Sequence, residues 1–157
     1  MLTLLRDDSA TATEDGLSYE PARGLSTLEP LLETYRAAGL QVVTTVSGVP
    51  HDLSASADLC AYRIVQEALT NTLKHAAAGT ATVGLHYLKS AVQILIADDG
   101  SARGGRSLAT GGYGLVGMRE RASLIGGQVE AGPAPSGGFI VTATIPYRSG
   151  ATKEGDW

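Results

Sequence analysis

Several side chains that could bind a charged ligand recur one helical turn apart near the middle of the sequence. Glu67, Asn71 and Lys74 follow one another at steps of four and three residues, with Arg63 one turn earlier and His75 at the edge. In a helix these steps place side chains on one face. Carboxylate and carboxamide oxygens suit a hard cation, and an ammonium group suits phosphate. Polar residues with this spacing also occur on ordinary solvated helices, so the spacing alone leaves both interpretations open.

The helix that carries these residues is predicted to run from about Ser54 to Ala78. Its other side is an apolar stripe that can pack on a sheet. The residues of that stripe are Ala57, Ala61, Ile64, Val65, Ala68, Leu69, Thr72 and Ala76. Cys60, the single cysteine, lies on the apolar side, and no disulfide or zinc spacing exists, so it is predicted to be a small buried hydrophobe.

A second candidate site follows the apolar run 91–97, where Asp98 and Asp99 precede Gly100. A carboxylate at the end of a buried strand could accept a hydrogen bond from an exocyclic amine such as that of adenine. Gly100 would let a ring lie against the backbone. A plain Asp-Gly turn between strand and loop is the alternative interpretation.

A third candidate site is the glycine-rich segment that opens a predicted helix at 114–125. Gly112 and Gly114 would leave backbone amides at the helix start, where an anion binds well. Leu115 follows, and Met118 could face either the core or a base. A flexible glycine-rich linker is the alternative, because Gly-x-Gly is a weak signal. No Gly-Lys-Ser/Thr sequence occurs, so a Walker-type phosphate loop is excluded.

Helices and strands alternate around these motifs in an order that predicts the fold class. Helix, strand, helix, two strands, helix and two strands give a sheet with helices on one face, a two-layer α/β sandwich. The helices are predicted at 25–38, 54–78 and 114–125, and the strands at 40–46, 80–88, 91–97, 128–131 and 139–145. Residues 1–24 are predicted as a linker that begins with the end of a longer helix whose beginning is missing, 25–147 as the domain, and 148–157 as a polar tail.

Length and composition narrow the class of protein further. The 157 residues suit one domain with a real core. The formal net charge of -4 argues against a nucleic-acid partner, since no basic excess exists to neutralise phosphates. No apolar run is long enough for a membrane span and no signal peptide is visible, so the segment is expected to be cytoplasmic.

The order and spacing of the three motifs resemble those of a known family. Glu67-x-x-x-Asn71, then Asp98-x-Gly100, then Gly112-x-Gly114-Leu115 is similar to the ATPase domain of sensor histidine kinases, which shares its ATP-binding fold with gyrase and MutL. The sequences of 66–76 and 114–121 look most like those of the nitrate-sensor and DesK-type subfamily. The resemblance covers about 25–146 and implies the Bergerat fold, a mixed, mostly antiparallel sheet covered on one face by about three helices.

The resemblance also implies a role for each motif. Asn71 would ligate Mg²⁺, and Glu67 would orient a water of that ion or a reacting group. Asp98 would accept a hydrogen bond from the adenine amine. ATP would be contacted further by Lys74, His75, Gly100, Gly112, Gly114, Leu115 and Met118. Two positions depart from the family pattern, since Ala102 replaces a usual glycine and Phe139 occupies a position where a small hydroxyl residue is common.

The phosphoacceptor that such a kinase needs is not predicted within this chain. His75 belongs to the first motif, His86 lies in a predicted strand, and His51 follows the loop signal Gly48-Val49-Pro50. By resemblance the chain is therefore the catalytic domain of a sensor histidine kinase, which passes the ATP γ-phosphoryl group to a histidine on a separate dimerisation domain. A response regulator would act downstream. The fragment is expected to be a monomer that does not label itself, and the full kinase a homodimer, with or without a membrane anchor.

Three alternatives stay open at this point. An anti-sigma-factor serine kinase of the same fold would be complete at this length and bind a sigma factor. A nucleotide-binding or protein-binding module without transfer activity is favoured by Ala102. A water-using ATPase such as gyrase or MutL is disfavoured, because no transducer domain follows. ATP turnover, or transfer to an added helical hairpin, would separate these functions.

Overall fold

The computed structural model of the chain describes residues 22–75, 79–100, 112–135 and 137–147, with only the backbone described for His75, Gly112 and Tyr113. The predicted linker, the polar tail and residues 101–111, between the second and third candidate sites, lie outside these residues. In chain order the elements are η2 (Leu25–Thr27), α2 (Leu28–Ala37), β1 (Gln41–Ser47), α3 (Ala55–His75), β2 (Thr80–Tyr87), β3 (Ala91–Asp98), α4 (Gly112–Leu124), β4 (Gln128–Pro133) and β5 (Phe139–Pro146).

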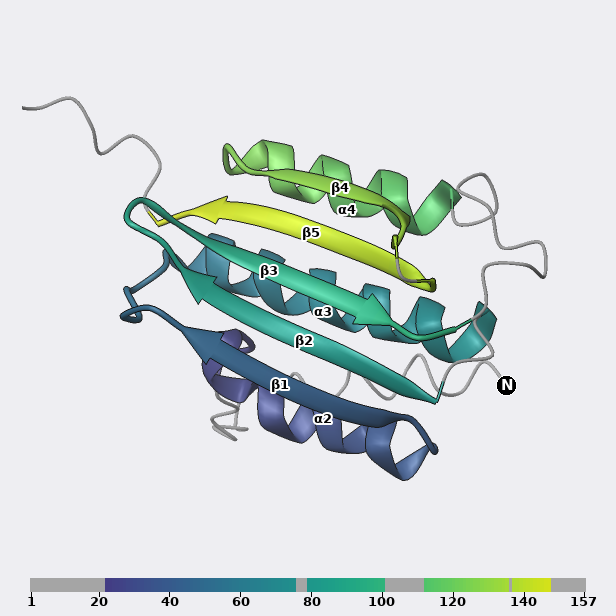
Figure 1. Ribbon diagram of the computed structural model, residues 1–157. Helices are drawn as coiled ribbons and strands as arrows, with labels where there is room; N and C mark the ends of the chain where they lie inside the picture. The colour runs from purple at the N-terminus through teal and green to yellow at the C-terminus, as the bar shows by residue number, and fades with distance from the viewer. Residues whose placement is uncertain (1–21, 76–78, 101–111, 136, 148–157) are drawn as a thin grey trace, which may run out of the picture.

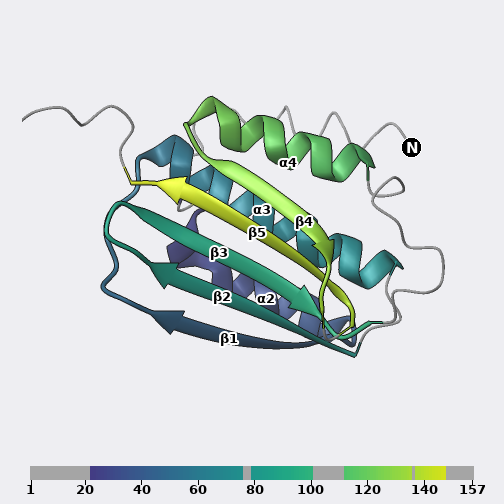
Figure 2. The ribbon, with the colours of Figure 1, turned by 45° about the horizontal axis from the view of Figure 1, so that its top comes forward.

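The strands form one five-stranded sheet in the order β1-β2-β3-β5-β4. Strands β1 and β2 are parallel, and the other neighbouring pairs are antiparallel. Figures 1 and 2 show α2, α3 and α4 on the same side of this sheet. The predicted two-layer sandwich with a mixed, mostly antiparallel sheet is therefore confirmed.

The alternation of side chains along β3 explains how an aspartate comes to lie inside the fold. Val92, Ile94 and Ile96 face the helices and are at most 2% exposed. Because side chains alternate between the two faces of a strand, Asp98 is the next inward position of the same series. It is 7% exposed, whereas Asp99, one residue later, is exposed. Two adjacent carboxylates thus have opposite surroundings.

Helix α3 runs along the middle of the helix layer and buries the predicted apolar stripe except for Ala76, which lies outside the described residues. Ala57, Ala61, Ile64, Val65, Ala68, Leu69 and Thr72 are all at most 3% exposed. The helix begins after Ser54, whose hydroxyl accepts a hydrogen bond from Ala57 N at 3.1 Å, the usual role of an N-cap. Cys60 is buried and unpaired, as predicted. The polar residues predicted on the other face are half-buried or exposed.

Helix α2 is fastened to α3 by a buried tyrosine. Tyr35 places its hydroxyl 3.0 Å from Gln66 O, to which it donates, and 2.7 Å from Thr70 Oγ1. Burial raises the pKa of the Tyr35 phenol. The predicted helix 25–38 is divided into η2 and α2, and α2 ends at Ala37, just before Gly39, whose φ of 104° suits glycine.

The opposite, N-terminal end of α3 is fastened to η2 by a carboxylate. Asp58 Oδ1 accepts a hydrogen bond from Leu25 N at 2.8 Å. A side chain on Gly24 would overlap the same carboxylate. None of the described helices combines the length and the apolar character needed to cross a bilayer.

Candidate nucleotide-binding site

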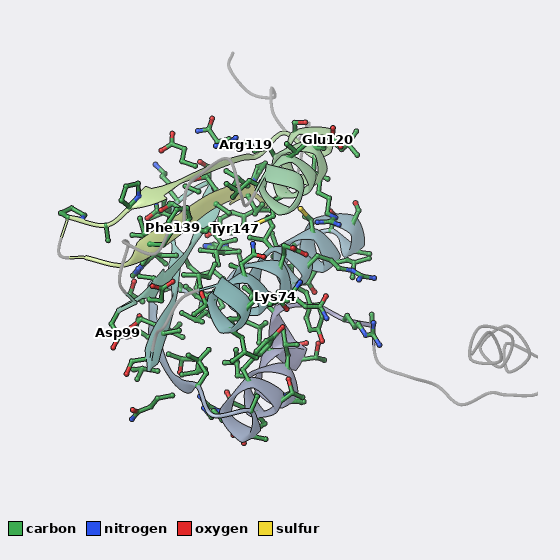
Figure 3. The ribbon with its side chains drawn as sticks, turned by 90° about the vertical axis from the view of Figure 1, so that its right-hand side faces the viewer. Lys74, Asp99, Arg119, Glu120, Phe139 and Tyr147 are labelled. Carbon is green, nitrogen blue, oxygen red and sulfur yellow. The ribbon has the colours of Figure 1, made fainter. Side chains whose placement is uncertain are left out.

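The residues of all three sequence motifs meet at one end of the molecule. Strand β3 ends there, β5 begins there, and the last turns of α3 and the first turn of α4 reach the same end. Figure 3 faces this end, with Asp99 and Phe139 on the sheet side and Lys74 on the helix side. The sequence spacing therefore predicted a true spatial cluster.

Asp98 is held by donors from three parts of the chain. Its Oδ1 accepts hydrogen bonds from Gly100 N at 2.9 Å and from Phe139 N at 3.3 Å. Its Oδ2 accepts one from Thr72 Oγ1, on α3, at 3.2 Å. A buried charge needs such partners, because burying an unpaired carboxylate is very costly. The carboxylate is thus fixed in one orientation at the end of the sheet.

The start of β5 approaches Asp98 closely enough to require glycine. Gly138 has φ 86°, and a β-carbon there would overlap the carbonyl oxygen of Asp98. Phe139, which replaces the small hydroxyl residue common in the family, contributes its backbone N–H to Asp98. Sequence reasoning did not single out Gly138, although its Gly-Gly pair before a strand was a visible signal.

Asp99 stabilises the entry to β2 instead of facing the helices. Its Oδ1 accepts hydrogen bonds from Gly79 N and Thr80 N, both at 3.0 Å, and its own N–H donates to Thr80 O. The hydrogen bond from the Thr80 amide lowers the pKa of the Asp99 carboxyl. Partial desolvation opposes this shift, and the hydrogen bond from the Gly79 amide adds to it. Asp99 therefore has a structural role that is distinct from the position of Asp98.

The polar face of α3 is opposed by the first turn of α4. A β-carbon placed on Gly114 would lie 2.8 Å from Glu67 Oε2 and 3.2 Å from Asn71 Nδ2. Glycine at this position lets the α4 backbone lie directly against these two side chains. A helix start carries free N–H groups and a partial positive charge, which attract an anion. Glu67 and Asn71 thus lie beside a position suited to phosphate.

The other predicted residues divide between this surface and the core. Lys74 is exposed on the last turn of α3, and Gly100 is buried beside Asp98. Leu115 and Met118 belong to the hydrophobic core, at 5% and 0% exposed, so the side chain of Met118 faces the core. His75 and Gly112 end α3 and begin α4, respectively. Ala102 lies outside the described residues.

The side chains at this end offer few ligands for a metal by themselves. Within the described ranges, no group of three or more His, Cys, Asp or Glu side chains could hold a metal ion. Glu67 and Asn71 nevertheless present a carboxylate and a carboxamide to the same position beside Gly114. Mg²⁺ commonly binds through one or two protein oxygens with phosphate and water completing its shell. The residues present therefore fit Mg²⁺ that arrives with a nucleotide.

Thr72 is the polar residue of the site that sequence reasoning missed. It was predicted as a member of the apolar stripe, and it is indeed 3% exposed. Its hydroxyl, however, reaches Asp98 Oδ2 as well as Ala68 O. The available signal was a hydroxyl residue inside an otherwise apolar stripe, next to Asn71 in the sequence.

Comparison with known proteins agrees with this arrangement. Residues 57–149 match the family described as histidine kinase-, DNA gyrase B-, and HSP90-like ATPase. Sensor histidine kinase YxjM of Bacillus subtilis is 33% identical over 125 residues, which cover 78% of this chain and 30% of YxjM. Sensor histidine kinase DesK of the same organism is 30% identical over 113 residues, 72% of this chain and 30% of DesK. The chain thus spans less than a third of these relatives.

Solved structures show the same fold. The cytoplasmic segment of histidine kinase QseC has a TM-score of 0.56 at 21% identity, covering 94% of this chain and 93% of that one. The ATP-binding domain of PrrB from Mycobacterium tuberculosis also has a TM-score of 0.56, at 22% identity, covering 75% and 88% of the two chains. With its matched family and its sequence relatives, the chain belongs to the histidine kinase-, DNA gyrase B- and HSP90-like ATPases, as the ATP-binding catalytic domain of a two-component sensor histidine kinase.

Proposed function

We propose that this domain binds Mg²⁺–ATP at the joined ends of α3, β3 and α4 and transfers the γ-phosphoryl group to a histidine on a separate dimerisation domain. The proposal rests on two features at the same end of the molecule. Three donors fix the Asp98 carboxylate, and the start of α4 lies against Glu67 and Asn71. The carboxylate suits a base, and the helix start suits phosphates.

The adenine amine would donate to Asp98, the buried carboxylate at the end of β3. The buried backbone of Gly100 lies next to it and offers a flat surface without a side chain. Base recognition would be stringent, because a buried acceptor that lacks its donor costs binding energy. The proposal for Asp98 thus predicts a preference for a purine with a 6-amino group.

The phosphates would lie between the first turn of α4 and the polar face of α3. Backbone amides at Gly112 and Gly114 would donate to phosphate oxygens, with Lys74 and His75 contributing positive charge or hydrogen bonds. Asn71 would ligate Mg²⁺, and Glu67 would orient a water of the ion or the incoming histidine. Bound Mg²⁺ would neutralise the charge that develops on the phosphate oxygens.

Transfer requires positioning more than covalent chemistry by the protein. The bond from the γ-phosphorus to its bridging oxygen breaks, ADP leaves with the bonding electrons, and a ring nitrogen of the acceptor histidine forms the new bond to phosphorus. Leu115 and Met118, in the core beneath α4, would hold the helix start in position for the transfer.

The expected partners follow from the same proposal. The histidine-bearing dimerisation domain would be the direct substrate, and a response regulator would receive the phosphoryl group next. We assign the catalytic domain to 25–147, with 1–24 as linker and 148–157 as tail. The cytoplasm is the expected compartment, in keeping with the cytoplasmic description of the similar QseC segment.

The test combines nucleotide binding with transfer to an added acceptor. Thermal unfolding of the chain is measured with and without Mg²⁺–ATP, since a ligand that binds only the native state raises the midpoint. The chain is then incubated with γ-labelled ATP and the histidine-bearing hairpin of a DesK-type kinase. The matched control is the same hairpin with its acceptor histidine replaced by glutamine.

The proposal expects a higher midpoint with Mg²⁺–ATP, acid-labile label on the hairpin, no label on the control hairpin and none on the chain itself. Binding without transfer to the hairpin would favour a nucleotide-binding module. Absence of any midpoint change would contradict the proposed nucleotide site.

A further inference from the structure

We propose that Thr72 is a positioning residue for Asp98 and that its hydroxyl sets the preference of the site for a 6-aminopurine nucleotide. This inference rests on the proposed function and assigns a role to a residue outside the motifs described above. Thr72 would act through Asp98, without itself contacting the base.

The first observation is that Thr72 and Asp98 form a polar contact between two elements within an apolar interior. Tyrosine and cysteine aside, they are the only buried polar residues among those that the structure describes, at 3% and 7% exposed. They come from different elements, 26 positions apart, and lie 3.2 Å apart between Thr72 Oγ1 and Asp98 Oδ2. A buried polar pair of this kind fixes geometry, because any other orientation would leave a polar atom unpaired.

The second observation is that the two carboxylate oxygens of Asp98 accept from different kinds of donor. Oδ1 accepts from two backbone amides, those of Gly100 and Phe139, which no side-chain substitution removes. The contact of Oδ2 with Thr72 comes from a side chain. A carboxylate oxygen can accept from two donors. Thr72 would therefore fix the orientation in which Oδ2 receives a second donor, the amine of the base.

The Thr72 hydroxyl has two acceptors within reach. Thr72 Oγ1 lies 3.1 Å from Ala68 O as well as 3.2 Å from Asp98 Oδ2. Because a carboxylate oxygen can accept from two donors, the hydroxyl can keep donating to Oδ2 when the amine of the base donates to the same oxygen. A donation to the carbonyl four residues earlier is common for threonine in helices, but that local bond explains nothing about Asp98.

The consequence is selectivity between bases that differ at position 6. An amine at this position donates to Asp98 Oδ2. Hypoxanthine has a carbonyl oxygen there instead, so two acceptors, this oxygen and Oδ2, would face each other. A carboxylate that is firmly oriented discriminates strongly between the two, because it cannot turn away from the wrong base. Loss of the Thr72 hydroxyl would loosen Asp98 and weaken binding of ATP more than binding of ITP.

The experiment compares the affinities of Mg²⁺–ATP and Mg²⁺–ITP by calorimetric titration of the full chain. Thr72→Val keeps the shape and removes the hydroxyl, and Thr72→Ser restores the hydroxyl. Thr72→Ala gives the same test should the valine variant fold poorly. The matched control is Thr70→Val on the same helix, whose lost hydroxyl pairs with Tyr35 and not with Asp98. Midpoints without nucleotide report on the fold of each variant.

We expect the ATP-to-ITP preference to fall about 5- to 20-fold in Thr72→Val and Thr72→Ala, the loss of one hydrogen bond to a charged group. Thr72→Ser should keep most of the preference for ATP over ITP. Thr70→Val should lower the midpoint without changing that preference. An unchanged preference in folded Thr72→Val would overturn the inference while leaving the proposed function intact. Absence of nucleotide binding by the parent chain would overturn both.

Discussion

The two ends of α3 use the same kind of bond for different purposes. At the N-terminal end, Asp58 accepts from Leu25 N and joins the helix to η2. At the C-terminal end, Asp98 accepts from two amides and a hydroxyl beside the α3 residues Asn71 and Thr72. The first carboxylate is half-exposed and the second is buried.

That difference in burial agrees with the proposed binding of nucleotide at the C-terminal end of α3. A half-exposed carboxylate with a backbone donor stabilises the fold at little cost, whereas a buried one loses much of its hydration. Asp98, the carboxylate whose burial costs more hydration, therefore lies at the end where β3, α3 and α4 meet. The N-terminal end also has a cavity of about 450 Å³, with Asp58, His51 and Tyr87 in its lining, and Gly24 lies against Asp58 there, but that carboxylate is only half-buried.

The largest expected effect is that of Asn71→Ala, at the C-terminal end. If Asn71 ligates Mg²⁺ as proposed, its removal should weaken Mg²⁺-dependent nucleotide binding on the order of 100-fold. The fold should persist, because the apolar stripe of α3 is untouched and alanine is the better helix former. Thermal unfolding with and without Mg²⁺–ATP gives the readout, and metal-independent binding of adenine should survive.

Gln66→Ala is the matched control for this prediction, since it removes a half-buried amide from the same helix one position before Glu67. It should keep the rise in midpoint that Mg²⁺–ATP causes. An undiminished rise in Asn71→Ala would remove Asn71 from the site and leave this face of α3 as ordinary surface.

The elements, and the placement of Glu67, Asn71 and Asp98, could be predicted from the sequence because they depend on local spacing. Steps of three and four residues placed Glu67 and Asn71 on the polar face of α3, and a run of apolar residues predicted the strand that ends at Asp98. The glycines before α4 indicated a helix start. Observed boundaries differ from the predicted ones by a few residues, as for α3, which begins at Ala55 and is described to His75.

Contacts between distant segments could not be predicted from spacing. Thr72 fits the apolar stripe by its position, and its contact with Asp98 depends on how α3 lies across β3. Gly138 is required because β5 begins directly beside Asp98, a consequence of the pairing of β3 with β5. The different surroundings of Asp98 and Asp99 likewise emerge only once the strand and its neighbours are in place.

A smaller effect is expected from Asp58→Ala, which tests the N-terminal end. The change leaves Leu25 N without its acceptor, so the free energy of unfolding should fall by about 1 to 2 kcal/mol. The rise in midpoint caused by Mg²⁺–ATP should be unchanged, because the site lies at the other end of α3. Urea unfolding measures the first quantity and thermal unfolding the second. Loss of nucleotide binding with an intact fold would contradict the separation of the two ends.

The smallest effect is expected from Asp99→Asn, because this carboxylate is exposed and solvent screens its charge. Asparagine keeps an oxygen that can accept from Gly79 N and Thr80 N, so only the charge is lost. After allowance for screening, the free energy of unfolding at neutral pH should fall by at most about 0.5 kcal/mol. Nucleotide binding should be retained, in contrast to a change at the adjacent Asp98.

The pH dependence of the Asp99→Asn effect separates charge from packing. The pKa of Asp99 is lower in the folded chain than in the unfolded one, chiefly through the Thr80 amide. Its charge therefore stabilises the fold above the unfolded value, about pH 4, and this contribution disappears as the pH falls through the folded value. In urea unfolding, the difference between the parent and Asp99→Asn should be constant from neutral pH to about pH 5 and should narrow below about pH 4. A stability difference that stays constant in acid would assign the effect to packing. Loss of ATP binding in Asp99→Asn would make Asp99 part of the site.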